Sequence, residues 1–105
     1  MSPPSKQRPP WTAEENAVIV AAYFEMLADE MAGRPYVKAA VRRRLQEGVL
    51  SNRTKGSIEY KFCNISSILD EHSEFYIDGY MPYSNVQRDL RTAVEQRLRA
   101  DGLID

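Results

Sequence analysis

Hydrophobic residues recur at three- and four-residue spacings in four stretches of the chain, and capping or helix-breaking residues bound each stretch. This spacing is the period of an amphipathic α-helix. We therefore predict helices over residues 12–32, 36–46, 54–71 and 84–101. The only candidate strand is a short run at residues 75–77. The pattern thus predicts an all-α domain of four helices.

Several helix ends carry recognisable signals. Thr12 and Glu15 have the spacing of a capping box at the first helix, which Gly33 is expected to end. Thr54 is the expected N-cap of the third helix and Ser84 that of the fourth. The second helix is expected to turn four apolar side chains inward. These are Val37, Ala40, Val41 and Leu45.

The third predicted helix divides into two faces when about 100° is assigned to each residue. The expected core stripe consists of Ile58, Phe62, Ile65 and Leu69, with Ile68 on its flank. The opposite face is small and polar around one tyrosine, and it consists of Gly56, Tyr60, Cys63, Asn64 and Ser67. Arg53 and Lys55 precede this outer face. Lys61 lies beside the core edge, where its stem can pack while its ammonium group reaches solvent.

Length and composition limit the possible classes of protein. A chain of 105 residues has room for one small domain. We expect residues 1–10, which contain four prolines, to form a mobile or polyproline-like arm that packs against nothing, and residues 11–105 to form the domain. One cysteine, no apolar signal segment and no membrane-length apolar run favour a reducing, cytoplasmic setting.

The net charge of −1 conceals a strongly basic segment. Residues 34–61 hold eight basic residues against two acidic ones, a local charge of +6. Residues 14–31 hold five acidic residues and no basic one. A phosphate group responds to the local field of one face rather than to the total charge. An anionic partner is therefore compatible with the sequence.

The outer face of the third helix has properties that suit the major groove of DNA. Small residues permit close approach, asparagine can pair with an adenine edge, and arginine or lysine can contact guanine or phosphate. The other interpretation is an amphipathic helix with a solvated polar face. Three adjacent arginines on the second helix, Arg42 to Arg44, spread over too wide an arc to share one surface. The candidate DNA-contacting residues are Arg42, Arg43, Arg53, Thr54, Lys55, Gly56, Tyr60, Lys61, Asn64 and Ser67.

Two motifs resemble those of known DNA-binding modules. The opening Trp11, Thr12, Glu14 and Glu15, and then Arg53, Thr54, Lys61, Phe62 and Asn64, resemble the first and third helices of Myb/SANT-like helix-turn-helix domains. RTKGSIEYKFCNIS followed by YIDGYMPYSNVQ is similar to a bacterial module that precedes an HNH or similar effector domain in restriction-endonuclease-type proteins. The similarity covers roughly residues 11–98.

This resemblance implies a helix-turn-helix core whose third helix docks on double-stranded DNA. It also implies a targeting role in a restriction or defence system, with a fused or neighbouring nuclease as partner. The chain has a single histidine, so it carries no HNH motif itself. The alternative is a SANT-like protein-interaction module, in which the acidic face of the first helix meets a basic partner or a fused domain.

The remaining candidates for chemistry are weaker. Tyr76, Tyr80 and Tyr83 crowd the connection before the fourth helix. Aromatic side chains can stack on nucleobases, but this connection is acidic, so we expect the tyrosines to pack over the helices. Cys63 and His72 are nine residues apart and lack a third group at a spacing typical of nucleophilic catalysis. We therefore expect a non-enzymatic protein without a cofactor or metal. Its oligomeric state is open.

Overall fold

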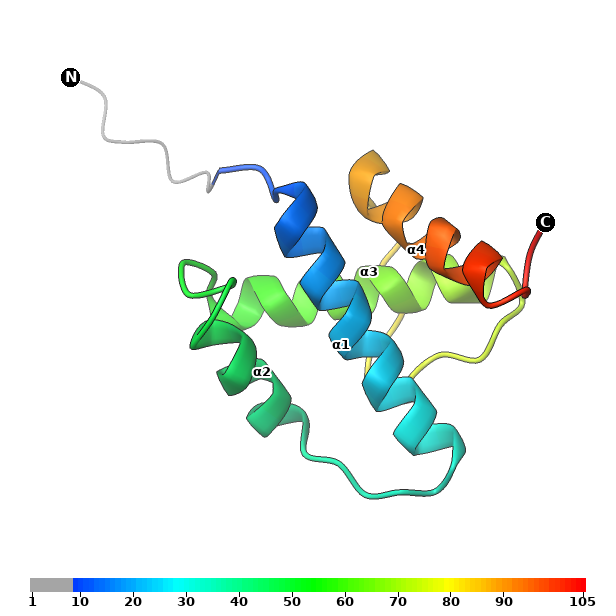
Figure 1. Ribbon diagram of the computed structural model, residues 1–105, viewed down its shortest axis with the longest axis horizontal. Helices are drawn as coiled ribbons and strands as arrows, with labels where there is room; N and C mark the ends of the chain where they lie inside the picture. The colour runs from blue at the N-terminus through cyan, green and yellow to red at the C-terminus, as the bar shows by residue number, and fades with distance from the viewer. Residues whose placement is uncertain (1–8) are drawn as a thin grey trace.

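The computed structural model describes residues 9–105. Over this range it has no strand and consists of four helices, α1 (Ala13–Met31), α2 (Lys38–Gln46), α3 (Lys55–Glu71) and α4 (Arg88–Ala100). In Figure 1, α1 crosses α3, with α2 beside the start of α3 and α4 beside its C-terminal half. The predicted all-α class and the four helices are therefore confirmed. The prediction of a proline-rich arm falls mainly on residues 1–8, outside the described residues.

α1 begins and ends as its capping residues predict. The backbone N–H of Glu15 donates to the Thr12 hydroxyl at 3.1 Å, and the Thr12 N–H donates to the Glu15 carboxylate at 2.9 Å. This reciprocal pair is a complete capping box. Beyond the helix, Gly33 has a φ of +71°, a conformation that glycine adopts without steric cost. Local sequence alone therefore defines both ends of α1.

α2 is the helix with the least burial. It begins at Lys38, two residues later than predicted, and none of its residues is fully buried. The expectation that Val37 and Ala40 turn inward is wrong, since both are exposed. Val41 and Leu45 are half-buried against the core. α2 is therefore held to the domain by one narrow apolar edge.

α3 begins where its cap predicts, and α4 does not. Thr54 accepts a hydrogen bond from the Ser57 N–H at 3.1 Å. α4 starts at Arg88, so the prediction that Ser84 caps it is wrong. Its N-cap residue, Gln87, makes no side-chain capping bond.

The chain before α4 stays extended because it is tied to α3. The Tyr83 N–H donates to the Cys63 carbonyl at 3.1 Å. Within residues 84–87, the Val86 N–H donates to the Ser84 carbonyl at 2.8 Å, a two-residue spacing in place of the four-residue spacing of an α-helix. The helical period of residues 84–87 is thus not followed in the segment next to this tertiary contact.

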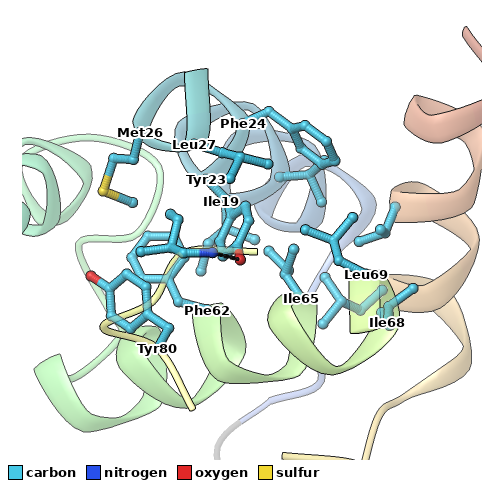
Figure 2. Close-up of a cluster of buried hydrophobic side chains, with 14 of the residues drawn as sticks. Ile19, Tyr23, Phe24, Met26, Leu27, Phe62, Ile65, Ile68, Leu69 and Tyr80 are labelled. Atoms are coloured by element: carbon cyan, nitrogen blue, oxygen red, sulfur yellow. Dashed lines mark hydrogen bonds between the residues drawn. The ribbon is translucent and has the colours of Figure 1, made fainter. Parts of the chain in front are cut away.

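The hydrophobic core lies between α1 and α3, and Figure 2 shows Ile19 and Tyr23 of α1 meeting Phe62 and Ile65 of α3. The Tyr23 and Phe62 ring centroids are 6.1 Å apart. The predicted α3 stripe is confirmed, because all four of its residues are buried, and Ile68 on its flank is buried too. Burial of each such side chain stabilises the fold by about 1.5–3 kcal/mol.

The connection between α3 and α4 completes this core. The Tyr23 hydroxyl accepts a hydrogen bond from the Ile77 N–H at 2.9 Å and lies 2.8 Å from the Ser66 hydroxyl. Tyr80 is buried, with its ring centroid 5.0 Å from that of Phe62. The prediction that this tyrosine-rich segment packs over the helices is confirmed for Tyr80.

None of the helices in residues 9–105 is both long enough and apolar enough to cross a membrane.

Candidate nucleic-acid interface

The predicted polar face of α3 is exposed only in the first turns of the helix. Lys55 and Gly56 are exposed, and Tyr60 is 40% exposed. Farther along the same side, Asn64 and Ser67 are only 1% and 5% exposed. The prediction that the whole polar face of α3 meets solvent is therefore wrong for Asn64 and Ser67.

The connection before α4 covers this second half of the face. The Asn64 side-chain amide donates to the Tyr83 carbonyl at 2.7 Å, while the Tyr83 N–H bonds to the Cys63 carbonyl. Asn64 therefore holds the connection against α3. Its amide oxygen is buried without a hydrogen-bond partner among the described residues.

Arg53 lies inside the domain instead of at its surface. It is 6% exposed, and its guanidinium group donates twice to the Glu15 carboxylate, each time at 2.7 Å. Its other bonds go to the carbonyls of Pro9 and Pro10, at 2.7 and 3.1 Å. The expectation that Arg53 stands free beside the outer face of α3 is wrong. So is the expectation that the proline-rich arm packs against nothing, as far as Pro9 and Pro10 are concerned.

The Arg53–Glu15 pair changes the acidity of both groups. Hydrogen bonding to Arg53 holds the pKa of Glu15 at about 2, well below its ordinary value of 4.5. The same bonds raise the pKa of Arg53 above its ordinary value. This buried, bidentate pair ties the start of α1 to the residue that precedes the cap of α3.

Trp11 packs beside the same pair and reaches Lys61. The ring centroid of Trp11 lies 4.9 Å from the Arg53 guanidinium carbon and 5.3 Å from the Lys61 nitrogen. Lys61 is 6% exposed, and its ammonium group donates to the Gln87 side chain at 3.2 Å. The expectation that the Lys61 ammonium reaches open solvent is wrong, because the group lies in a recess.

The three arginines of α2 separate onto different sides, as their spacing predicts. Arg44 lines a hollow against α1 together with the acidic residues Glu25 and Asp29. Arg43 is exposed, and Arg42 is half-buried, donating to the Gln46 side chain at 3.0 Å. Arg42 and Arg43 are thus the α2 arginines that do not line the hollow against α1.

Gln46 connects these arginines to the start of α3. Its side-chain amide donates to the Arg53 carbonyl at 3.0 Å, one residue before the Thr54 cap. Arg42 is therefore separated from the beginning of α3 by a single side chain. Thr54 is exposed, although its hydroxyl is engaged in the cap.

Of the ten predicted residues, the structure brings five exposed or half-exposed ones near the start of α3. These are Arg42, Arg43, Thr54, Lys55 and Gly56, with Tyr60 one turn further on. Tyr83, which is expected from the sequence to pack over the helices, is 49% exposed, and its ring centroid lies 5.6 Å from that of Tyr60. No periodicity links Tyr83 to α3, because the contact depends on the path of an irregular segment.

The two residues considered for nucleophilic chemistry, Cys63 and His72, are not joined in residues 9–105. His72 lies 2.9 Å from the Glu95 carboxylate, and no hydrogen bond or ion pair joins it to Cys63 there. Burial raises the pKa of the Cys63 thiol, which disfavours a reactive thiolate. No group of three or more metal-binding side chains occurs in the described part of the chain.

No family model, curated protein or solved structure matches this chain. The similarity to Myb/SANT-like domains therefore stays a prediction that rests on the motifs themselves.

Proposed function

We propose that this protein binds double-stranded DNA through the first turns of α3, as the non-enzymatic targeting part of a restriction or defence system. In this proposal, Gly56 and Tyr60 approach the DNA groove, and Lys55 together with Arg42 and Arg43 of α2 contacts phosphates. The system-level role comes from the motif resemblance alone. The binding role is supported by the residues at the start of α3.

Gly56 is the observation that carries the proposal. It is the second residue of α3, in helical conformation, where glycine is less favourable than alanine by up to about 1 kcal/mol. A Cβ atom built at Gly56 would meet no atom within 4 Å. Neither backbone conformation nor packing therefore requires glycine here. Close approach of a partner to the helix backbone is a physical reason for it.

The charges around Gly56 favour a phosphate backbone as that partner. Lys55 is exposed, with no ion pair in the described part of the chain. Arg42 and Arg43 likewise have no carboxylate partner there, whereas Arg34 is paired with Asp29 at 2.9 Å. Lys55, Arg42 and Arg43 thus carry positive charge without an ion pair on α2 and the first turn of α3, and Arg44 and Arg88 do so too in the described residues. The helix N-terminus adds a favourable field for phosphate.

Fluorescence anisotropy with a labelled mixed-sequence duplex tests the proposal, at about 50 mM salt, where phosphate contacts bind most tightly. The wild-type protein should bind at micromolar concentration. Gly56→Ala should weaken binding about tenfold or more while its free energy of unfolding stays equal or rises by up to about 1 kcal/mol. Gly48→Ala, at another glycine with a negative φ, is the matched control. Absence of wild-type binding at micromolar protein would contradict the proposal.

A protein-interaction role is favoured by a different surface. Phe75 is 75% exposed and Met31 is 62% exposed, and they line one hollow of about 360 Å³ with Leu27 and Tyr76. Exposed apolar patches of this kind mark interaction sites. A photo-crosslinking amino acid in place of Phe75 should then capture a defined protein partner, and the same group in place of Arg34 should not. Equal capture from both positions would reject this second function.

A further inference from the structure

A recess beside the start of α3 has a composition that points to a small-ligand site. It has a volume of about 460 Å³, within the range of about 300–1,000 Å³ usual for ligand sites. It lies between residues 9–11, the first turns of α3 and the residue before α4. Its walls are formed by Pro9, Pro10, Trp11, Arg53, Gly56, Ser57, Tyr60, Lys61 and Gln87.

Lys61 gives this recess an incompletely satisfied positive charge. Its side chain is buried, and an ammonium group has three N–H donors. The one hydrogen bond it makes in the described residues goes to the neutral side chain of Gln87. No carboxylate of residues 9–105 lies within ion-pair distance of its nitrogen. A buried charge without a counter-ion is costly, and an anion in the recess would relieve that cost.

Arg53 does not compete for such an anion. Its charge is already matched by the two bonds to Glu15, and its remaining bonds go to backbone carbonyls. Burial, and then the nearby charge of Arg53, lower the pKa of Lys61. A bound anion would act in the opposite direction and favour the charged ammonium group. Lys61 is therefore the group in this recess that is available to bind an anion.

The other walls suit a flat, partly apolar group attached to that anion. Trp11 and Tyr60 contribute aromatic surfaces, and aromatic side chains stack on nucleobases of any sequence. Gly56 leaves open space above the helix backbone, so a planar ring can approach closely. Trp11 is partly occupied by the two cations near its ring, which leaves Tyr60 as the more available stacking surface.

We propose that the recess binds a nucleoside phosphate, with its phosphate on the Lys61 ammonium group and its base against Tyr60. The nucleotide can be free or can be the unpaired end of a nucleic-acid strand, because both present the same chemistry. The recess shares Gly56 and Tyr60 with the proposed duplex surface, but its phosphate contact is the buried Lys61, which is not part of that surface, so variants of Lys61 test it separately.

Trp11, the only tryptophan of the chain, supplies a direct readout, because it lines the recess. The full chain is titrated with thymidine 5′-monophosphate, thymidine, inorganic phosphate and a short oligothymidylate while Trp11 fluorescence is recorded. The monophosphate should give a saturable change, with affinity about tenfold or more above that of thymidine or phosphate alone. A change with the oligonucleotide alone would identify a strand end as the natural source.

Two variants and one control decide the role of each group. Lys61→Met keeps the buried stem but removes the charge, and should lose affinity for the monophosphate about tenfold or more. Tyr60→Leu, at a partly exposed position, should lose the preference for the nucleotide over inorganic phosphate. Arg99→Met, at an exposed position of α4 outside both the recess and the proposed duplex surface, should bind like wild type.

Several outcomes would overturn the inference. Equal affinity for thymidine and its monophosphate would show that the Lys61 ammonium group does not bind the phosphate. Equal affinity for inorganic phosphate and the monophosphate would show that Tyr60 does not bind the base. No fluorescence change with either the monophosphate or the oligonucleotide would reject the site, even if duplex binding is present.

Discussion

The first turns of α3 and its last turns belong to one helix, yet they have opposite surroundings. Around Lys55 and Gly56 the polar side of the helix is open to solvent. From Asn64 to Leu69 the helix is enclosed by α1, α4 and the connection before α4, and even Ser66 and Ser67 are buried, whereas Asp70 and Glu71 at its end are exposed. Figure 1 shows why, since α4 lies beside only the C-terminal half of α3. A polar face on a helix is thus not by itself a binding surface.

Two basic residues that are only two positions apart in the sequence also differ in their surroundings. Arg53 is held by four hydrogen bonds inside the domain, whereas Lys55 is exposed. Their different surroundings lead to different expected effects of mutation. The predictions below follow from that contrast, beginning with the largest effect.

Arg53→Ala should lower the free energy of unfolding by about 3–5 kcal/mol, because it leaves Glu15 buried without its counter-charge. Lys55→Ala should change it by no more than about 0.5 kcal/mol, as is usual for surface substitutions. Urea unfolding followed by circular dichroism measures both. Losses of similar size in the two variants would contradict the contrast between these residues.

The Glu15–Arg53 pair should also make the free energy of unfolding depend on pH in the acidic range. A carboxyl group whose pKa is lowered on folding adds stability that is complete above its ordinary pKa of 4.5. That contribution is lost as the pH falls toward the folded pKa of about 2. The stability difference between wild type and Glu15→Gln should therefore shrink from about pH 5 to about pH 2. Urea titrations at several pH values measure it, and a constant difference would show that the pair is not coupled to folding.

Asn64→Ala should lower the free energy of unfolding by about 1–3 kcal/mol, because the Tyr83 carbonyl loses its donor. It should leave the DNA sequence preference unchanged, since Asn64 is buried. Unfolding experiments combined with binding to a panel of duplexes test both parts. A changed sequence preference with unchanged stability would place Asn64 at the DNA after all.

Local signals in the sequence were enough to predict most of the fold. The capping box at Thr12, the cap at Thr54 and the apolar stripe of α3 all depend on neighbours within a few residues. The start of α4 at Arg88 could not be predicted this way, because the preceding segment is held by bonds between Tyr83 and α3. The same long-range contacts hide Asn64.

The candidate site was predictable only in part for the same reason. A helical wheel orders the residues of α3 by direction, and it correctly separates Ile58 and Phe62 from Gly56 and Tyr60. It contains no information about which other segment covers each direction. Partners that are 38 residues apart, such as Glu15 and Arg53, have no spacing rule that would reveal them.

The central claim is that the exposed start of α3 and the neighbouring α2 residue Arg43 contact phosphates. The salt dependence of duplex binding tests this claim most directly. The slope of the logarithm of the binding constant against the logarithm of salt concentration reports the number of neutralised phosphates, at about 0.9 per contact. Lys55→Ala combined with Arg43→Ala should reduce that slope by about 1.8. Arg44→Ala, on the same helix as Arg43 but facing α1, should leave the slope unchanged. A double variant with the wild-type slope would contradict the account.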